Sequence, residues 1–362
     1  SNHDLFEENK FEEGLLKSQD FQTKQEGILK EVPSLKLSNQ YNGMGKIKRS
    51  SIGGLKSQYK YDNYLRLSQT TDTYKGKKLT LKLNYVQNYF QNLDYSVGKG
   101  NLMSFIKNVK RNSFGSIEEI EYGNGLKIQK NYEDYTDFQF GMTSFHSDNK
   151  ERPLLMEEVY YNFDNMSLNI TERTTYSMLK KASFENFQYD KNWQLNSKNS
   201  DLSTYKRDTE GRVTNIGPHK ITWNNQNLLT VKGQKIFYDH SGMIMASCPE
   251  SVGNKINDND CLIFKSRNTI VYKGKIVQLI YFDKYPVGVW VDDQVYPVIT
   301  DHLGSIKGMF DPSGKELLWH RNYGPWGKKD VVFNKKSAHN VKELEALTVW
   351  SFSQLIEIPG VN

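Results

Sequence analysis

The segment Tyr61-Asp62-Asn63-Tyr64-Leu65-Arg66-Leu67 contains the sequence unit that decides the fold. An aromatic residue is followed by Asp or Asn, then by a short turn, and then by a strand that begins with an aliphatic residue. The Asp or Asn side chain can bond to the backbone of the turn, and Gly or Asn accepts the left-handed conformation that such a turn needs. The unit therefore predicts a β-hairpin.

The same unit recurs along the chain in a looser form. Seven further copies begin at Tyr41, Phe163, Tyr189, Arg207, Trp223, Tyr238 and Phe310. Such a repeat predicts one long antiparallel meander of hairpins. Alternating segments such as Lys235-Ile236-Phe237-Tyr238 and Val287-Gly288-Val289-Trp290-Val291 predict strands with one buried face. Because exposed strand edges invite aggregation, the meander must close, spiral or stack.

The composition also favours β structure. Hydrophobic residues make up 37% of the chain and aromatic residues alone 13%, which leaves 24% for the aliphatic residues and cysteine. Aromatic side chains suit pleated, half-buried surfaces better than helix interiors. We therefore predict an all-β fold, in which the antiparallel meander winds into a curved sheet, spiral or partial shell around a thin core.

Charge and hydropathy exclude two classes of partner. The net charge of +6 comes from 48 basic and 42 acidic residues without a concentrated basic tract, so we expect no nucleic-acid partner. No apolar run reaches the roughly 18 residues of a membrane helix, so we expect no membrane-spanning segment.

The two cysteines, Cys248 and Cys261, bracket the polar segment from Pro249 to Asp260. A local disulfide that closes this loop is the first interpretation, and it would indicate an oxidising compartment. Two unrelated free thiols are the alternative. A metal site is disfavoured because no second Cys or His pair stands at ligand spacing.

Four ordered segments in the C-terminal third resemble a known family. Phe282-Asp283-Lys284-Tyr285-Pro286-Val287-Gly288-Val289 precedes Asp301-His302-Leu303-Gly304-Ser305, and Phe310-Asp311-Pro312-Ser313-Gly314 and then Tyr323-Gly324-Pro325-Trp326-Gly327 follow. Together they resemble the end of the core of Rhs proteins, also called YD-repeat proteins. The structural signature comprises Asp301, His302, Leu303, Gly304, Ser305, Tyr323, Pro325, Trp326 and Gly327.

The resemblance implies a β-sheet strip that winds into a hollow shell, as in Rhs toxins, the C components of insecticidal toxin complexes and teneurins. In many such proteins the shell encloses a C-terminal toxin. The expected function is a non-enzymatic shell segment that encapsulates, shields or delivers a toxin or other protein partner in bacterial competition, secreted or at the cell surface. A hollow shell would wet both faces of its wall, in keeping with few aliphatic residues.

The chain departs from the family pattern near its end. Residues 350 to 362 resemble the approach to the family's self-cleavage region, but Ile358 stands where an aspartate before Pro-Gly is expected. We therefore expect a fragment of a longer protein, or a shell element whose cargo lies elsewhere. We divide the chain into a lead-in with possible early strands (1–33), the YD/Rhs-repeat region (34–330) and a terminal part (331–362) with a short helix at Lys342 to Leu347.

No motif predicts an enzyme, and we expect no catalytic, cofactor-binding or metal-binding residues. The pair Asp301-His302 resembles a base and its orienting acid, but no Gly-x-Ser-x-Gly nucleophile accompanies it, so we expect a structural role. The acidic residues near the cysteines and the acids Asp292 and Asp293 lack the pattern of a calcium loop. The alternative function is an extracellular carbohydrate- or receptor-binding adhesion module, in which exposed aromatic residues stack on cell-surface glycans.

Overall fold

The computed structural model is built almost entirely of β-strands, as the sequence predicts. It describes residues 5–25, 28–86, 89–134, 139–149, 151–164, 169–189, 195–198, 205–210, 212–216, 219–224, 227–231, 234–238, 244–252, 255–266, 268–283, 285–291, 293–301, 304–323 and 329–334. Within these ranges the chain forms 31 strands and two short 3-10 turns, Pro33–Leu35 and Glu250–Val252, and no α-helix. The helix expected at Lys342 to Leu347 lies outside these ranges.

The strands divide into two strips. The first strip comprises β1 (Leu5–Glu12), β2 (Leu15–Gln25), β3 (Ile28–Glu31), β4 (Leu37–Tyr41), β5 (Ile47–Ile52), β6 (Leu55–Tyr61), β7 (Leu67–Tyr74), β8 (Lys77–Val86), β9 (Tyr89–Val97), β10 (Met103–Arg111), β11 (Ile117–Tyr122), β12 (Leu126–Tyr132), β13 (Gln139–His146), β14 (Leu155–Phe163), β15 (Ile170–Ser177), β16 (Lys180–Tyr189) and β17 (Leu195–Lys198). The second strip comprises β18 (Tyr205–Arg207), β19 (Val213–Ile216), β20 (His219–Asn224), β21 (Asn227–Val231), β22 (Gln234–Tyr238), β23 (Ile244–Pro249), β24 (Leu262–Ser266), β25 (Thr269–Tyr272), β26 (Lys275–Phe282), β27 (Tyr285–Val291), β28 (Gln294–Thr300), β29 (Ile306–Phe310), β30 (Leu317–Tyr323) and β31 (Lys329–Asn334).

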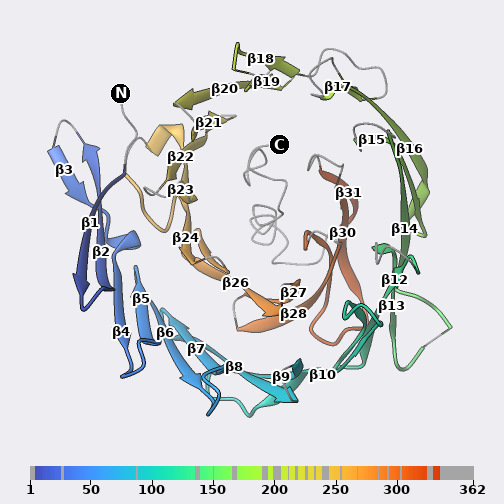
Figure 1. The fold of residues 1–362 in the computed structure, drawn as a ribbon, viewed down its shortest axis with the longest axis horizontal. Coiled ribbons are helices and arrows are strands. Elements are labelled where there is room, and N and C mark those ends of the chain that lie inside the picture. Colours follow the sequence, from blue (N-terminus) through green and yellow to red (C-terminus); the bar gives the residue numbers. More distant parts are fainter. Residues whose placement is uncertain are drawn as a thin grey trace.

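Each strip is an antiparallel meander, with 17 strands in the first and 14 in the second. Consecutive strands pair throughout, except that β2 pairs with both β3 and β4. Figure 1 shows the first strip winding around the periphery from β1 to β17, and the second strip continuing the same curve and then passing inside the first from β22 onward. The result is a spiral rather than a closed barrel.

The repeated hairpin unit is a turn closed by its Asp or Asn residue. At Asp62 the backbone amide donates to the Arg66 carbonyl at 2.9 Å, and the carboxylate accepts hydrogen bonds from the amides of Tyr64 and Arg66, both at 2.9 Å. The same pattern occurs at Asn42, Asn112 and Asp208. The side chain thus replaces backbone partners that the reversal leaves unpaired.

One position in the turn departs from the expectation. The unit predicts Gly or Asn in the left-handed position, and Gly45 and Gly115 fill it with φ of 73° and 87°. In the Asp62 turn, however, Leu65 takes this conformation with φ of 60°. The three hydrogen bonds that Asp62 makes hold the turn in a conformation that an L-residue such as leucine disfavours.

Tyrosines at strand ends link successive units. Each hydroxyl donates a hydrogen bond of 2.8 to 3.0 Å to a backbone carbonyl in the preceding unit. The acceptor is the aliphatic residue with which a strand of that unit begins. The four pairs are Tyr61 with Ile47, Tyr85 with Leu67, Tyr132 with Ile117 and Tyr189 with Ile170. Tyrosine therefore has two roles in the unit, because its ring packs while its hydroxyl bonds to the preceding unit.

The main core lies between the two strips. One apolar cluster combines residues of β5 to β14 with residues of β25 to β30. Within it the Phe90 ring stacks on the Phe282 ring with centroids 4.3 Å apart, and the Tyr122 hydroxyl donates to the Val287 carbonyl at 2.9 Å. Gly288 allows the closest approach, since a Cβ atom there would overlap the Phe105 ring. The two strips therefore form a double layer.

The double layer corrects two expectations. A wall with water on both faces was expected, and one buried face was expected for Val287 to Val291. In β27, however, Val287 and Trp290 pack in the core between the strips, while Val289 and Val291 belong to a second buried cluster on the opposite face. Alternation alone would place Val287 with Val289 and Val291, but a register shift between β26 and β27 leaves Val287 unpaired and brings it to the face of Trp290. The alternation also does not show that both faces are covered.

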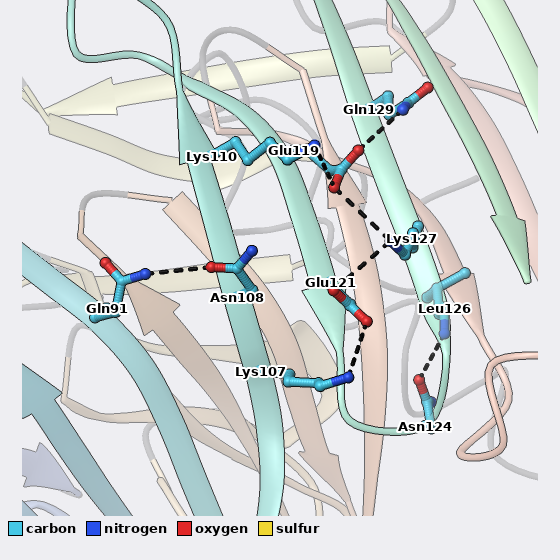
Figure 2. A network of polar contacts seen from close by, with 10 residues as sticks. All are labelled: Gln91, Lys107, Asn108, Lys110, Glu119, Glu121, Asn124, Leu126, Lys127 and Gln129. Carbon is cyan, nitrogen blue, oxygen red and sulfur yellow. Dashed lines mark hydrogen bonds and ion pairs between the residues drawn. The ribbon is translucent and has the colours of Figure 1, made fainter. Parts of the chain in front are cut away.

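The outer face of the first strip is polar. Figure 2 shows a ladder of charged and amide side chains across β9 to β12, in which Lys107 lies 3.2 Å from Glu121 and Lys110 lies 3.3 Å from Glu119. Ile120 and Tyr122, which alternate with these acids in β11, are buried against the second strip. The amphipathic strands that the composition predicts therefore occur in the first strip.

Candidate functional site

Among the described residues of the predicted signature, Asp301, Gly304 and Ser305 belong to a turn. Asp301 follows β28, its amide donates to the Ser305 carbonyl at 3.0 Å, and its carboxylate accepts the Ser305 amide at 2.8 Å. Gly304 has a φ of +82°. This arrangement is the same turn as at Asp62, so the signature is another copy of the hairpin unit.

Tyr323 is the other signature residue that the structure describes. Tyr323 ends β30, where its backbone pairs with Lys329. His302, Leu303, Pro325, Trp326 and Gly327 lie outside the described residues.

Cys248 and Cys261 form a disulfide, with Cα atoms 4.3 Å apart. It joins β23 to the segment before β24, and both cysteines are fully buried. They pack in a small apolar cluster that also contains Phe21 from β2 and Leu35 from the first 3-10 turn. The disulfide therefore lies where the beginning of the first strip meets the second strip.

The acidic residues considered for calcium are separately engaged. Asp258 accepts a hydrogen bond from the Tyr74 hydroxyl at 2.8 Å and pairs with Lys265 at 3.1 Å. Asp260 accepts a hydrogen bond from the Asn257 amide, Asp293 lies 3.9 Å from Lys77, and Asp292 is outside the described residues. Across the described part of the chain, no three His, Cys, Asp or Glu side chains lie close enough together to hold a metal ion.

A buried ion cluster connects the two strips. Glu157 extends from β14 of the first strip, and Lys307 and His320 extend from β29 and β30 of the second. The Lys307 ammonium contacts the Glu157 carboxylate directly, and His320 Nε2 lies 3.2 Å from Glu157 Oε2. None of the three side chains is more than 3% exposed. Glu157, Lys307 and His320 are called the buried ion cluster below.

The cluster was not predicted from the sequence, which drew attention to Asp301 and His302 instead. A weak signal was present, because Lys307 interrupts the otherwise apolar segment Ile306 to Phe310 and His320 directly follows the apolar run Leu317 to Trp319. Nothing in the sequence indicates that Glu157, about 150 residues earlier, would meet them.

Burial shifts the protonation of the cluster. It lowers the pKa of the Lys307 ammonium to about 7. Burial also holds the pKa of His320 well below 6.5, and the nearby charges of Lys307 and Lys180 add to this effect. His320 is therefore neutral at pH 7. A cavity beside Lys307 and Glu157 measures about 30 Å³, which is room for a water molecule and too little for an organic substrate.

Acidification is expected to destabilise the protein through His320. Below about pH 6.5 the histidine is protonated in the unfolded chain but stays neutral in the folded protein. The free energy of unfolding therefore falls by up to about 1.4 kcal/mol for each pH unit of acidification. Chemical denaturation at pH 6.5, 6.0, 5.5 and 5.0 measures this slope. We expect a shallower slope in His320→Gln, and the parental slope in the control His146→Gln, which lies at the end of β13 outside the cluster. Equal slopes in the His320→Gln variant and the parent would contradict this assignment.

An aromatic platform lies on the outer face of β13 to β16. The Phe140 ring stacks on Tyr160 with centroids 5.7 Å apart, and Tyr160 meets Tyr176 edge to face at 6.1 Å. Tyr160, Tyr176 and Phe184 are all exposed. Because Glu157 points to the second strip, the alternation in β14 turns Glu158 and Tyr160 outward, where the Tyr160 hydroxyl donates to the Glu158 carboxylate at 3.1 Å.

The described residues contain no helix that has both the length and the apolar character to cross a membrane.

Comparisons with known proteins relate the fold to toxin structures. No family model matches the sequence, and no curated protein matches it. Among solved structures, the crystal structure of TcdB2-TccC3-Cdc42 has a TM-score of 0.55 at 13% identity, covering 90% of this chain and 23% of that one. The crystal structure of TcdB2-TccC3 has a TM-score of 0.54 at 12% identity over 90% and 23%.

A third structure agrees with these two. The Tc holotoxin pore of Photorhabdus luminescens has a TM-score of 0.52 at 13% identity, covering 90% of this chain and 22% of that chain. The chain thus spans less than a quarter of the length of the chains it resembles. At this level of identity the similarity concerns the fold: the chain has the Rhs-like β fold of a segment of these Tc toxin chains.

Proposed function

We propose that this chain is a non-enzymatic wall segment of an Rhs/YD-repeat shell, which holds a protein cargo such as a toxin on its inner side. The observation that carries the proposal is the spiral of two strips, which 90% of the chain shares with segments of Tc toxin chains. A double layer with a continuous apolar core between its sheets makes a stiff wall.

The two faces of the wall differ in a way that supports the proposal. The outer face of the first strip carries the charged ladder of Figure 2, which suits contact with water. The second strip lies inside the first (Figure 1), so the apolar cluster on its far face, which includes Val277, Leu279, Val289 and Val291, faces inward. These side chains are fully buried, as is typical of a surface that packs against polypeptide. We further propose that the protein is secreted into an oxidising compartment, where its disulfide is stable, and that it acts in bacterial competition.

Site-specific photocrosslinking in the organism that encodes the protein tests the wall function. The probe p-benzoylphenylalanine is placed at Tyr272, which packs against the inward cluster, or at Lys107 on the outer face. Illumination is expected to join position 272, and not position 107, to a polypeptide segment that resists protease while the wall is folded. Crosslinks from position 107 alone, or a partner digested as fast in the folded protein as in denaturant, would contradict the proposal.

A second candidate function is carbohydrate binding at the aromatic platform. Exposed rings of Tyr160, Tyr176 and Phe184 can stack on the apolar faces of sugar rings. The Glu158 carboxylate and the Asn162 amide, which contacts Glu172 at 2.7 Å, supply hydrogen-bonding groups for hydroxyls on the same outer face. This platform is the specific feature that favours the adhesion alternative.

Glycan-array binding distinguishes this candidate from the wall function. Binding that falls at least about tenfold in Tyr160→Ala, and not in Phe114→Ala at the exposed turn of Asn112, would support a carbohydrate site. An array without signal would remove the candidate and leave the wall proposal unaffected.

A further inference from the structure

A cleft of about 410 Å³ lies between the two strips, bounded by β5 to β9 of the first strip and by β24 to β26 of the second. We infer that this interlayer cleft is a binding site for a compact aromatic group that carries one N–H donor, as in an indole. The inference does not depend on the proposed wall function. It rests on the apolar part of the cleft lining and on one buried acceptor at its polar end.

About half of the residues that line the cleft are apolar, and several of these are aromatic. Ile52, Leu55, Leu81 and Leu93 contribute aliphatic surface and are all buried. Aromatic rings add to this apolar lining, and they belong to Tyr59, Tyr85, Phe90 and Tyr281. Most of the rest of the lining is polar and includes Ser57, Asp72 and Gln278, so the cleft suits a molecule with an apolar body and a polar edge. Its volume falls in the usual range for small-molecule sites.

The polar end is formed by a hydrogen-bonded group of three residues. Asp72 accepts hydrogen bonds from the Ser57 hydroxyl and, at 2.7 Å, from the Gln278 side-chain amide. These bonds occupy both Asp72 oxygens and fix the orientation of the Gln278 side chain. They also join the strips, because Ser57 and Asp72 belong to β6 and β7, whereas Gln278 belongs to β26.

The Gln278 side-chain oxygen is the buried acceptor from which we infer a ligand. Gln278 is 2% exposed and lines the cleft, and its Oε1 has no hydrogen-bond partner within the described part of the chain. Leaving a buried acceptor unpaired costs about 1–3 kcal/mol. A donor brought by a ligand into the cleft would recover this energy.

The surroundings define the chemistry of that ligand. Its body must be apolar and flat enough to lie among the aromatic rings, and its polar group must donate. Asp72 disfavours an anionic group beside Gln278, and burial raises the pKa of the Asp72 carboxyl, which shows how poorly the site tolerates charge. A neutral N–H on an aromatic ring satisfies these conditions, either in a small molecule or in a tryptophan side chain of another polypeptide segment.

Calorimetric titration with indole and benzofuran tests the inference on the unmodified protein. The two probes have nearly the same shape, but benzofuran has an oxygen where indole has its N–H. We expect indole to bind about tenfold more tightly, because a hydrogen bond to a buried acceptor contributes on the order of 1 kcal/mol. Equal affinities, preference for benzofuran or no binding of either probe would overturn the inference.

A variant locates the site, and a third probe identifies the source of the ligand. Gln278→Leu is expected to remove the preference for indole, whereas Gln129→Leu on the outer face is expected to keep it. A preference that persists in folded Gln278→Leu would overturn the assignment. N-acetyltryptophanamide represents a tryptophan side chain in a polypeptide. If the protein binds both indole and this probe, the natural ligand is a tryptophan side chain; if it binds indole alone, the ligand is a free small molecule. Both results support the site.

Discussion

Replacing Lys307 with methionine is expected to lower the free energy of unfolding by about 3–5 kcal/mol, because it leaves the Glu157 carboxylate buried between the strips without its cation. Glu157 has no exposed surface, so water cannot replace the lost partner. Denaturant unfolding followed by circular dichroism and by tryptophan fluorescence measures the loss. Trp290 and Trp319 are buried in the second strip and report on its packing.

The double variant Lys307→Met with Glu157→Leu separates the charge effect from a general loss of packing. Because it removes both members of the pair, we expect it to regain most of the stability that the single variant loses. Lys110→Met is the matched control on the outer face. The Lys110 side chain is 61% exposed and its loss is expected to cost about 0–1 kcal/mol. A loss in Lys307→Met no larger than in this control would show that the buried ion cluster does not hold the strips together.

Replacing Phe282 with alanine is expected to lower the free energy of unfolding by about 3–5 kcal/mol. Phe282 is fully buried in the core between the strips, and its ring lies nearly parallel to that of Phe90, with an angle of 8°. Its removal leaves a cavity between two sheets whose strands are fixed by their own ladders and cannot easily collapse. The same denaturant measurements report this loss.

A double-mutant cycle with Phe90→Ala tests whether the strips pack as a double layer. Phe90 lies in β9 and Phe282 in β26, so a coupling of about 0.5–1.5 kcal/mol would come from the contact between the two strips. Phe114→Ala, at an exposed turn residue, is the control and is expected to change stability by less than about 0.5 kcal/mol. Strictly additive effects of Phe90→Ala and Phe282→Ala would contradict contact between the layers.

The local structure of the hairpin unit was largely predictable from the sequence. Asp62, Asn42 and Asp208 form the turns that their positions predict, because each turn is closed by atoms within five residues of one another. The copy at Asn112 was missed, although it forms the same bonds and follows Arg111 as Asp208 follows Arg207. The bond between Tyr61 and Ile47 was missed as well, since it joins neighbouring units rather than residues of one unit.

The candidate sites were predicted less well. The disulfide partners could be named because only two cysteines exist in the chain. Glu157, Lys307 and Gln278 could not be singled out, because each gains its role from the opposite strip. A buried charge or amide looks in the sequence like any polar residue on a solvated strand face until its neighbours are known.

The sequence by itself determined that this chain is an antiparallel meander, where several of its turns lie and, in strands without a register shift, which residues share a face. These properties depend on hydrogen bonds and side-chain alternation over a few residues. Only the tertiary structure decided that the second strip passes inside the first and that both faces of the second strip are buried. That outcome depends on contacts such as Phe90 with Phe282 and Glu157 with Lys307, whose members are separated by 150 residues or more. No local pattern encodes which parts of a curved strip will meet, because their meeting is selected by the fit of two whole surfaces.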